Sequence, residues 1–208
     1  MIYLLPGKSS LIGKPDYFGC ITTPHNRTPP RPIKEGRMFA VDNECFTKPF
    51  DLMRMAATLE ATRPHIKQCL FVVVPDIPWH NGQRVFDATI TLEMFDEYAN
   101  HIIFRGWPLA YVAQNGAELL PIPAEASAVF IGGDTEWKES SAALSVIKRA
   151  QERGLWVHVG RVNSKRRINH FALAGVDSVD GTGLTFAPDR VMEQLTRWLA
   201  QKPLNLAY

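Results

Sequence analysis

The stretch AVFIGGDTEWKESSAALSVIKRAQERGLWVHVGRVNSKRRINHFALAGVDSVDG (128–181) decides the fold. Two helical patterns in it alternate with three short runs typical of β-strands: AVFIG (128–132), WVHVG (156–160) and DSVDG (177–181). Strands and helices that alternate at spacings of about 20 to 30 residues indicate βαβ units, in which consecutive strands run parallel. This stretch therefore predicts a parallel sheet.

Capping residues mark the boundaries of the two helices. Ser140 is a candidate N-cap for the first helix and Gly154 can end it, while Ser164 and Gly175 bound the second helix in the same way. Further helices are expected near 50–61, over a longer range near 83–104, and after Pro188. The range 23–36, with four prolines, is expected to be a long loop.

Five further apolar runs complete the strand pattern: IYLLP (2–6), FGCIT (18–22), MFAVD (38–42), LFVVV (70–74) and LAYVA (109–113). Continuous apolar runs are expected of parallel strands that are covered on both faces. Eight strands favour a closed (β/α)8 barrel of the TIM type, although the first run could instead be an edge strand or a cap. Because such barrels typically need about 250 residues, a chain of 208 residues must have short or degraded units. We expect a single α/β domain over 1–208.

Composition excludes several classes of protein. No apolar run reaches the roughly 20 residues of a membrane span, and MIYLLPGKSS (1–10) lacks the pattern of a signal peptide. The three cysteines lie far apart, and none forms a CxxC pair that would indicate zinc. We therefore expect a soluble, cytoplasmic protein without disulfides or zinc.

Polar residues and glycines follow the predicted strands, each near a carboxyl end. These residues are Asp42, Asp76, Gln114, Gly132, Gly133, Gly160 and Asp180. In a parallel barrel these ends share one face, where active sites are built. Asp177 and Asp180 are three positions apart on one strand, so alternation points their side chains to opposite faces and both cannot line the pocket.

This set of residue types suits exchange or cleavage at a nucleoside C1′. A carboxylate can trap the oxocarbenium-like centre covalently, while a second carboxyl handles the proton of the leaving base. Guanine offers N1–H and a 2-amino group as donors and O6 as an acceptor. A carboxylate accepts from the first two, and a Gln side chain or backbone N–H groups can donate to O6.

At these residues the chain resembles the tRNA-guanine transglycosylase superfamily. The segment Asp42-Asn43-Glu44-Cys45-Phe46 is similar to the family's DSGGF-type motif, and Ala113-Gln114-Asn115-Gly116 to its VQG motif. The family's IGG, GVG and GVDxFD motifs resemble Ile131-Gly132-Gly133, His158-Val159-Gly160 and Gly175-Val176-Asp177-Ser178-Val179-Asp180. The ordered set covers about residues 38 to 181.

The resemblance implies a role for each of these positions. Asp180 would be the nucleophile and Asp42 the general acid/base. The guanine base would be read by Asp76, Gln114, Gly132 and Gly133. The free 7-deazaguanine base would be the co-substrate, and no further cofactor is implied.

The departures from the family pattern point to a particular branch. The family's zinc site is absent, and Gly181-Thr182-Gly183-Leu184 replaces its Cys-Val-Leu-Pro-Thr-Arg segment. The chain thus looks like the compact transglycosylases of phages and bacterial modification systems that place 7-deazaguanines into DNA. DNA is the favoured partner and tRNA the alternative, and homo-oligomers are possible. A hydrolase of N-glycosidic bonds and a non-enzymatic nucleic-acid-binding barrel remain open as other functions.

Two basic clusters could contact phosphates, which supply most sequence-independent affinity for nucleic acids. The cluster expected to grip the nucleic acid consists of Arg161, Lys165, Arg166 and Arg167, with no acid among them. The other lies at 27–37. Three more residues have expected roles: His158 packs inside the barrel or meets a backbone partner, Trp137 could stack on a base, and Lys138 is solvated.

Overall fold

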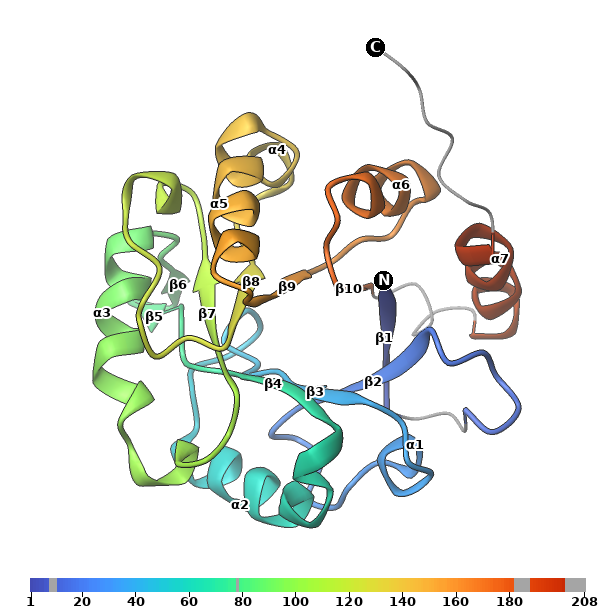
Figure 1. Ribbon diagram of the computed structural model, residues 1–208. Helices are drawn as coiled ribbons and strands as arrows, with labels where there is room; N and C mark the ends of the chain where they lie inside the picture. Colours follow the sequence, from blue (N-terminus) through green and yellow to red (C-terminus); the bar gives the residue numbers. More distant parts are fainter. Residues whose placement is uncertain (8–10, 78, 182–187, 201–208) are drawn as a thin grey trace.

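The computed structural model describes residues 1–7, 11–77, 79–181 and 188–200, and they form a closed barrel of parallel strands (Figure 1). The strands pair in the order β1-β10-β9-β8-β7-β4-β3-β2, and β2 returns to β1. They are β1 (Ile2–Pro6), β2 (Phe18–Thr22), β3 (Phe39–Val41), β4 (Cys69–Val73), β7 (Leu109–Ala113), β8 (Ala128–Ile131), β9 (Trp156–Val159) and β10 (Ser178–Asp180). All eight predicted strands are present, so the predicted TIM-type α/β fold is confirmed.

Helices surround the barrel between successive strands, as Figure 1 shows. They are α1 (Arg31–Lys34), α2 (Leu52–Thr62), α3 (Ala88–Ala99), α4 (Thr135–Lys138), α5 (Ser141–Glu152), α6 (Lys165–Leu173) and α7 (Pro188–Ala200). Short 3₁₀ helices add to them: η1 (Arg63–Gln68), η2 (Ile102–Phe104) and η3 (Ala117–Leu119). The three-residue η3 is the helix assigned between β7 and β8, so this unit is reduced, as the chain length predicted.

Local capping explains where the helices begin. The side chain of Ser140 accepts a hydrogen bond from the N–H of Ala143, and that of Ser164 accepts one from the N–H of Arg167. Both predicted caps are therefore confirmed, and a cap of this kind is worth about 1 kcal/mol. Gly154 and Gly175 follow these helices with positive φ angles, which a glycine adopts without strain.

Side chains alternate along the strands between two separate apolar clusters. The inner cluster fills the barrel and includes Leu4, Phe71 and Val112, with Phe130 packed against it. The outer cluster lies between the strands and the helices and includes residues such as Val129. This two-residue period decides which side chains of β9 and β10 reach the barrel interior.

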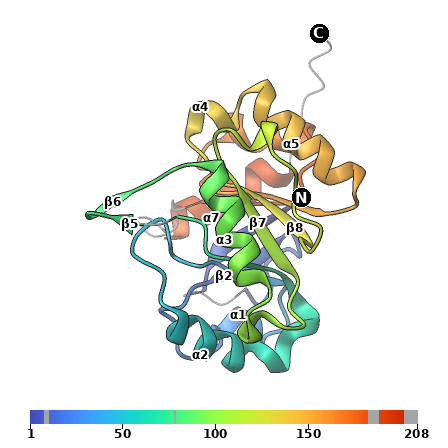
Figure 2. The ribbon, with the colours of Figure 1, turned by 90° about the vertical axis from the view of Figure 1, so that its left-hand side faces the viewer.

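The range near 83–104 differs from the expected long helix. Two short strands, β5 (Trp79–His80) and β6 (Gln83–Arg84), pair as an antiparallel hairpin before α3 begins. Asn81 and Gly82 both have positive φ angles, as a tight two-residue hairpin turn requires. The side chain of Asp87 then caps α3, and the hairpin projects beyond the barrel and its helices (Figure 2).

None of the helices within the described ranges has the length and apolar character needed to cross a membrane.

Candidate active site

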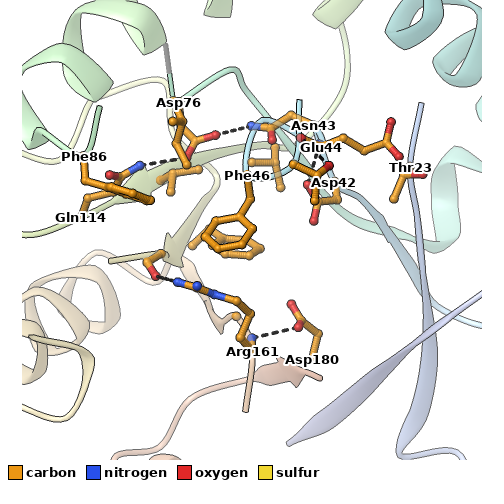
Figure 3. A pocket seen from close by; sticks show the side chains of 17 residues that line it. Thr23, Asp42, Asn43, Glu44, Phe46, Asp76, Phe86, Gln114, Arg161 and Asp180 are labelled. Atoms are coloured by element: carbon orange, nitrogen blue, oxygen red, sulfur yellow. Dashed lines mark hydrogen bonds between the residues drawn. The ribbon is translucent and has the colours of Figure 1, made fainter. Parts of the chain in front are cut away.

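The carboxyl ends of the strands surround a pocket of about 360 Å³. The pocket brings together five of the six predicted catalytic and base-binding residues, which come from positions after β3, β4, β7, β8 and at the end of β10 (Figure 3). They are Asp42, Asp76, Gln114 and Asp180, which Figure 3 labels, and Gly132. Its volume lies in the range of small-molecule sites, about 300–1,000 Å³. Carboxylates from three separate strands therefore face one cavity.

Gly133, the sixth predicted residue, lines a second pocket that adjoins the first. The two pockets share Phe46, Phe86 and Arg161 in their linings. A Cβ on Gly133 would overlap Cε3 of Trp137, so glycine is needed there for the close approach of that indole.

Trp137 does not line the pocket, so it is not placed for the base stacking that the sequence suggested. Its side chain is buried, and its indole N–H donates a 3.0 Å hydrogen bond to Oε2 of Glu118. Two phenyl rings do stand at the pocket: Phe46 and Phe86 line it and are 37% and 44% exposed. Their centroids are 6.3 Å apart.

Asp76 is held by two side-chain amides. Asn43 Nδ2 donates to Oδ1 at 2.7 Å, and Gln114 Nε2 donates to Oδ2 at 2.9 Å. Burial nevertheless raises the pKa of Asp76 to about 7, against the lowering effect of the two amides. Gln114 is expected to donate to guanine O6; one N–H of its amide bonds to Asp76, and the amide has a second N–H for a ligand. The buried Gln114 Oε1 has no hydrogen-bond partner among the described residues, so Gln114 can also offer a ligand an acceptor.

Asp42 follows β3 and begins a strained loop. The N–H of Glu44 donates to Asp42 Oδ1 at 2.8 Å, and Glu44 has a φ angle of 60°, which is uncommon for a residue other than glycine. Burial raises the pKa of Asp42 to about 6, and the negative charge of Asp180 contributes to the same shift. A carboxyl with a pKa near neutral can both give and take a proton, as a general acid/base must.

Asp180 occupies the inward position at the end of β10, with 14% of its side chain exposed. Its Oδ2 lies 3.0 Å from Nε2 of His158, and its Oδ1 accepts a 2.9 Å hydrogen bond from the N–H of Arg161. Asp177, in contrast, accepts from the N–H of Val157 at 2.7 Å and is absent from the pocket lining. The prediction that the two aspartates face apart is confirmed.

Arg161 belongs to the pocket wall, whereas the sequence predicted a contact with phosphates. Its φ angle is 62°, and its guanidinium Nη2 donates to the carbonyls of Gly132 and Gly133 at 3.0 and 2.6 Å. The guanidinium also lies 4.2 Å from the centroid of the Phe46 ring. These contacts direct the Arg161 head group to the βα turn after β8 and to an aromatic ring.

The rest of that basic cluster is partly neutralised by an acid from another unit. Glu139 pairs with Arg166 at 2.6 Å and with Arg167 at 3.0 Å, a proximity that the sequence separation concealed. Arg167 also donates to the carbonyl of Arg161 at 2.8 Å. Lys165 and Arg166 are the exposed members of the cluster and remain the candidates for phosphate contacts. In the other basic cluster, Arg31 pairs with Glu35, and Arg37 lies before β3 at the opposite face of the barrel.

Lys138 is fully buried, although the sequence predicted a solvated side chain. Its Nζ donates a 2.7 Å hydrogen bond to the carbonyl of Gly160, whose residue lines the pocket. Burial, together with the nearby charges of Arg161 and Arg167, lowers the pKa of Lys138 to about 7. Nothing in the sequence indicates that Lys138 is buried, because a lysine between Glu136 and Glu139 is typical of an exposed surface.

His158 lies inside the barrel, as the sequence predicted, with side chains as its partners, whereas Asn43 had no predicted role although the sequence could have indicated one. His158 lies two residues before Gly160, so strand alternation places its side chain inside the barrel. Asn43 directly follows Asp42 in the loop after β3. The segment 181–184 departs from the motif of the transglycosylase superfamily. Gly181 belongs to the described residues, and residues 182–184 lie outside them.

Comparisons with known proteins add little to this geometry. No protein-family model and no curated protein sequence matches the chain. A solved structure described as a glycerophosphoryl diester phosphodiesterase from Silicibacter pomeroyi aligns at 13% identity, with a TM-score of 0.35. The alignment covers 76% of this chain and 50% of that one, so it spans about half the length of the phosphodiesterase chain.

Proposed function

We propose that the chain is a base-exchange transglycosylase, which replaces a guanine in nucleic acid with a free 7-deazaguanine base through a covalent aspartyl intermediate. The observation that carries the proposal is the convergence of Asp42, Asp76 and Asp180 around one pocket of about 360 Å³. Exchange at C1′ needs a nucleophile, a proton carrier and a reader of the base. The three carboxylates differ in surroundings in a way that suits these three tasks.

In the first half-reaction, a carboxylate oxygen of Asp180 attacks C1′, and the C1′–N9 bond breaks. The electron pair of that bond leaves with guanine, and the carboxyl proton of Asp42 passes to the departing base. The pKa of Asp42, raised to about 6, means that a fraction of the molecules holds this proton near neutral pH. The products are a glycosyl ester on Asp180 and free guanine.

In the second half-reaction, the 7-deazaguanine occupies the place of guanine. Its N9 gives its proton to the Asp42 carboxylate and attacks C1′, and the ester bond to Asp180 breaks with its electron pair returning to the carboxylate. The hydrogen bonds that Asp180 receives from Arg161 N–H and His158 stabilise the released carboxylate. The site then returns to its starting protonation state.

Base recognition falls to Asp76 and Gln114. In its ionised form Asp76 accepts from the N1–H and 2-amino groups that guanine and 7-deazaguanines share, and Gln114 Oε1 supplies a further acceptor. Both side chains are buried and line the pocket, so a ligand that lacks these donors leaves Gln114 Oε1 unpaired and adds no hydrogen bond to Asp76. This penalty favours guanine over adenine.

DNA is the favoured nucleic acid because the chain resembles the compact, zinc-free members of the superfamily. A target guanine in a duplex must leave the base stack to reach a pocket at the strand ends. Phe46 and Phe86, which are exposed at the pocket, offer surfaces on which it or its neighbours can stack.

The test is incubation of the protein with a guanine-containing DNA duplex, or with tRNA, in the presence of labelled guanine. Incorporation of label supports exchange, an abasic product indicates an N-glycosidic hydrolase, and neither indicates a protein that only binds. Asp180→Asn should lower the rate of incorporation by several orders of magnitude, as is usual on loss of a covalent nucleophile.

Asp177→Asn is the matched control. It makes the same chemical change near the same strand, but its carboxylate bonds to the N–H of Val157 outside the pocket. Its exchange rate should be close to that of the unaltered chain. Near-normal exchange by Asp180→Asn would remove Asp180 from the mechanism.

A further inference from the structure

A chain of hydrogen bonds inside the barrel ends on the carboxylate of Asp180. Nε2 of His158 lies 3.0 Å from Asp180 Oδ2, and Nδ1 of His158 lies 2.8 Å from Oγ of Ser178. The indole N–H of Trp156 donates to the same Ser178 Oγ at 2.8 Å. Two adjacent strands supply all four side chains from alternate positions, and Ser178 pairs in register with His158. This series of hydrogen bonds therefore depends on the pairing of β9 with β10.

The imidazole of His158 has a single orientation in this surrounding. It is fully buried, and the rings of Phe71 and Phe130 lie 5.1 and 4.6 Å from it, centroid to centroid. Ser178 is also fully buried. A fully buried ring that packs against two phenyl rings and is bonded through both nitrogens cannot flip without breaking two hydrogen bonds.

The hydrogen bonds define where the protons lie. An indole nitrogen can only donate, so Ser178 Oγ is the acceptor toward Trp156. Within the described part of the chain, the remaining partner for the Ser178 hydroxyl hydrogen is Nδ1 of His158. Nδ1 therefore accepts, and the neutral ring carries its proton on Nε2. That N–H points at Asp180 Oδ2, where an ionised carboxylate accepts.

We propose that His158, held as the Nε2–H tautomer by Ser178 and Trp156, is the positioning residue for the nucleophilic carboxylate of Asp180. This inference rests on the proposed function, which makes Asp180 the nucleophile. The Arg161 N–H binds one carboxylate oxygen and the His158 Nε2–H binds the other, so the plane of the carboxylate is determined. Each oxygen keeps a lone pair that it can direct at C1′.

The first test changes His158 while leaving its volume in place. His158→Phe fills the space beside Phe71 and Phe130 but has no donor for Asp180. We expect kcat to fall about 10²-fold, the loss associated with a misdirected catalytic group, while KM for the base changes less than about twofold. His158→Gln keeps an N–H donor on a longer side chain and should recover part of the lost kcat.

Ser178→Ala tests the series of hydrogen bonds one step further from Asp180. It leaves His158 and Asp180 in place but removes the hydroxyl that donates to Nδ1. The Nδ1–H tautomer then becomes accessible, and its bare Nε2 would face Asp180. We expect a smaller fall in kcat, about tenfold, again with little change in KM. This variant also decides the matter if His158→Phe does not fold.

A measurement without catalysis reads the tautomer directly. Long-range ¹H–¹⁵N correlation spectra of the unaltered chain should show His158 protonated at Nε2, and Ser178→Ala should shift this signal toward the Nδ1–H form. An Nδ1–H tautomer in the unaltered chain would overturn the inference. Unchanged kcat in both His158→Phe and Ser178→Ala would do the same.

Failure of the proposed function gives a different result. The unaltered chain would then incorporate no labelled base and form no covalent adduct with DNA or tRNA. Failure of the positioning role alone would leave the unaltered chain active and the His158 and Ser178 variants equally active.

Discussion

The side-chain amide of Asn43 donates a 2.7 Å hydrogen bond to the carboxylate of Asp76, joining the loop after β3 to the segment after β4. The same Nδ2 also donates to the carbonyl of Val74 at 2.8 Å. Asn43 thus connects the loop that carries Asp42 to the base-reading carboxylate. Both aspartates are buried enough for the pKa of each to be raised, so the site has a pH dependence that can be measured.

Base affinity should follow the ionisation of Asp76. Because the pKa of this carboxyl is raised to about 7, the ionised form that accepts from guanine N1–H and the 2-amino group prevails only at higher pH. We expect affinity for a free 7-deazaguanine to fall by about tenfold per pH unit below 7 and to level off above it. Calorimetric titration from pH 5.5 to 8.5 measures this.

Asp76→Asn should bind the base weakly and with little dependence on pH. Asp134→Asn is the control, because Asp134 lies in the adjoining pocket and caps α4, a role that Asn performs equally well. Affinity of the unaltered chain that stays flat over this pH range would contradict the assignment of Asp76.

Asp42→Asn should stabilise the fold at alkaline pH. The pKa of Asp42 is raised from 3.8 to about 6, so the folded chain keeps a proton that the unfolded chain has already lost between these values. The stability that the carboxyl contributes below pH 4 is therefore lost as the pH rises through 6. Removal of the ionisable group should raise the free energy of unfolding at pH 8 by on the order of 1–3 kcal/mol.

Urea unfolding of Asp42→Asn at pH 4 and pH 8 checks this sign, since the gain should disappear at the lower pH. Asp51→Asn, a change at the partly exposed cap of α2, should show no such gain at pH 8. A stability gain equal at the two pH values would show that the pKa of Asp42 is not its cause.

Lys138→Met should destabilise the fold, and more so at alkaline than at acidic pH. The pKa of Lys138 is lowered from 10.5 to about 7, so its stabilising effect is present at high pH and is lost as the pH falls through 7. At pH 9 the variant loses the hydrogen bond to the Gly160 carbonyl, and we expect a cost of about 1–3 kcal/mol. The cost should shrink at pH 6, where the unaltered chain must bury a charged amine.

Chemical unfolding at pH 6, 7.5 and 9 measures this trend. Lys148→Met provides the comparison, because Lys148 lies on α5 with 78% of its side chain exposed. A Lys138→Met cost that is the same at all three values would disprove the buried, neutral state of this lysine.

Phe46→Ala should weaken nucleic-acid binding without destabilising the fold. The ring lines both pockets and is 37% exposed, and stacking of a base on an aromatic ring is worth about 1–3 kcal/mol. We therefore expect affinity for a guanine-containing single strand to fall by roughly 10- to 100-fold, measured by fluorescence anisotropy.

Ile102→Ala is a suitable control for this loss. Ile102 is 62% exposed on η2, which precedes β7 and so lies at the end of the barrel opposite the pocket. Equal affinities of the two variants would exclude stacking on Phe46.

The sequence predicted the strands and helix caps well because both depend on local patterns. Runs such as WVHVG indicate buried strands wherever they occur, and Ser140 and Ser164 cap helices through bonds that reach only three residues ahead. The hairpin at 79–84 was missed because the expected helix near 83–104 began in its second strand, and the Asn81-Gly82 turn before it was not recognised.

The site itself was predicted in part. That Asp42, Asp76 and Asp180 share a face follows from their position after parallel strands, which needs only the fold class. That Arg161 and Arg167 contact phosphates stays a prediction, but their contacts with Glu139 and two glycine carbonyls were not predicted, because these groups come close only in three dimensions. The buried state of Lys138 had no local signal at all.

By itself, then, the sequence determined the order of strands and helices and the end of the barrel at which polar residues gather, since alternation and capping act over a few residues. Only the tertiary structure decided which polar atoms meet there. The contacts of His158 with Asp180, Lys138 with Gly160 and Asn43 with Asp76 join residues 22 to 33 positions apart. Their geometry depends on barrel closure and on the register of neighbouring strands, and no local sequence pattern predicts either of these.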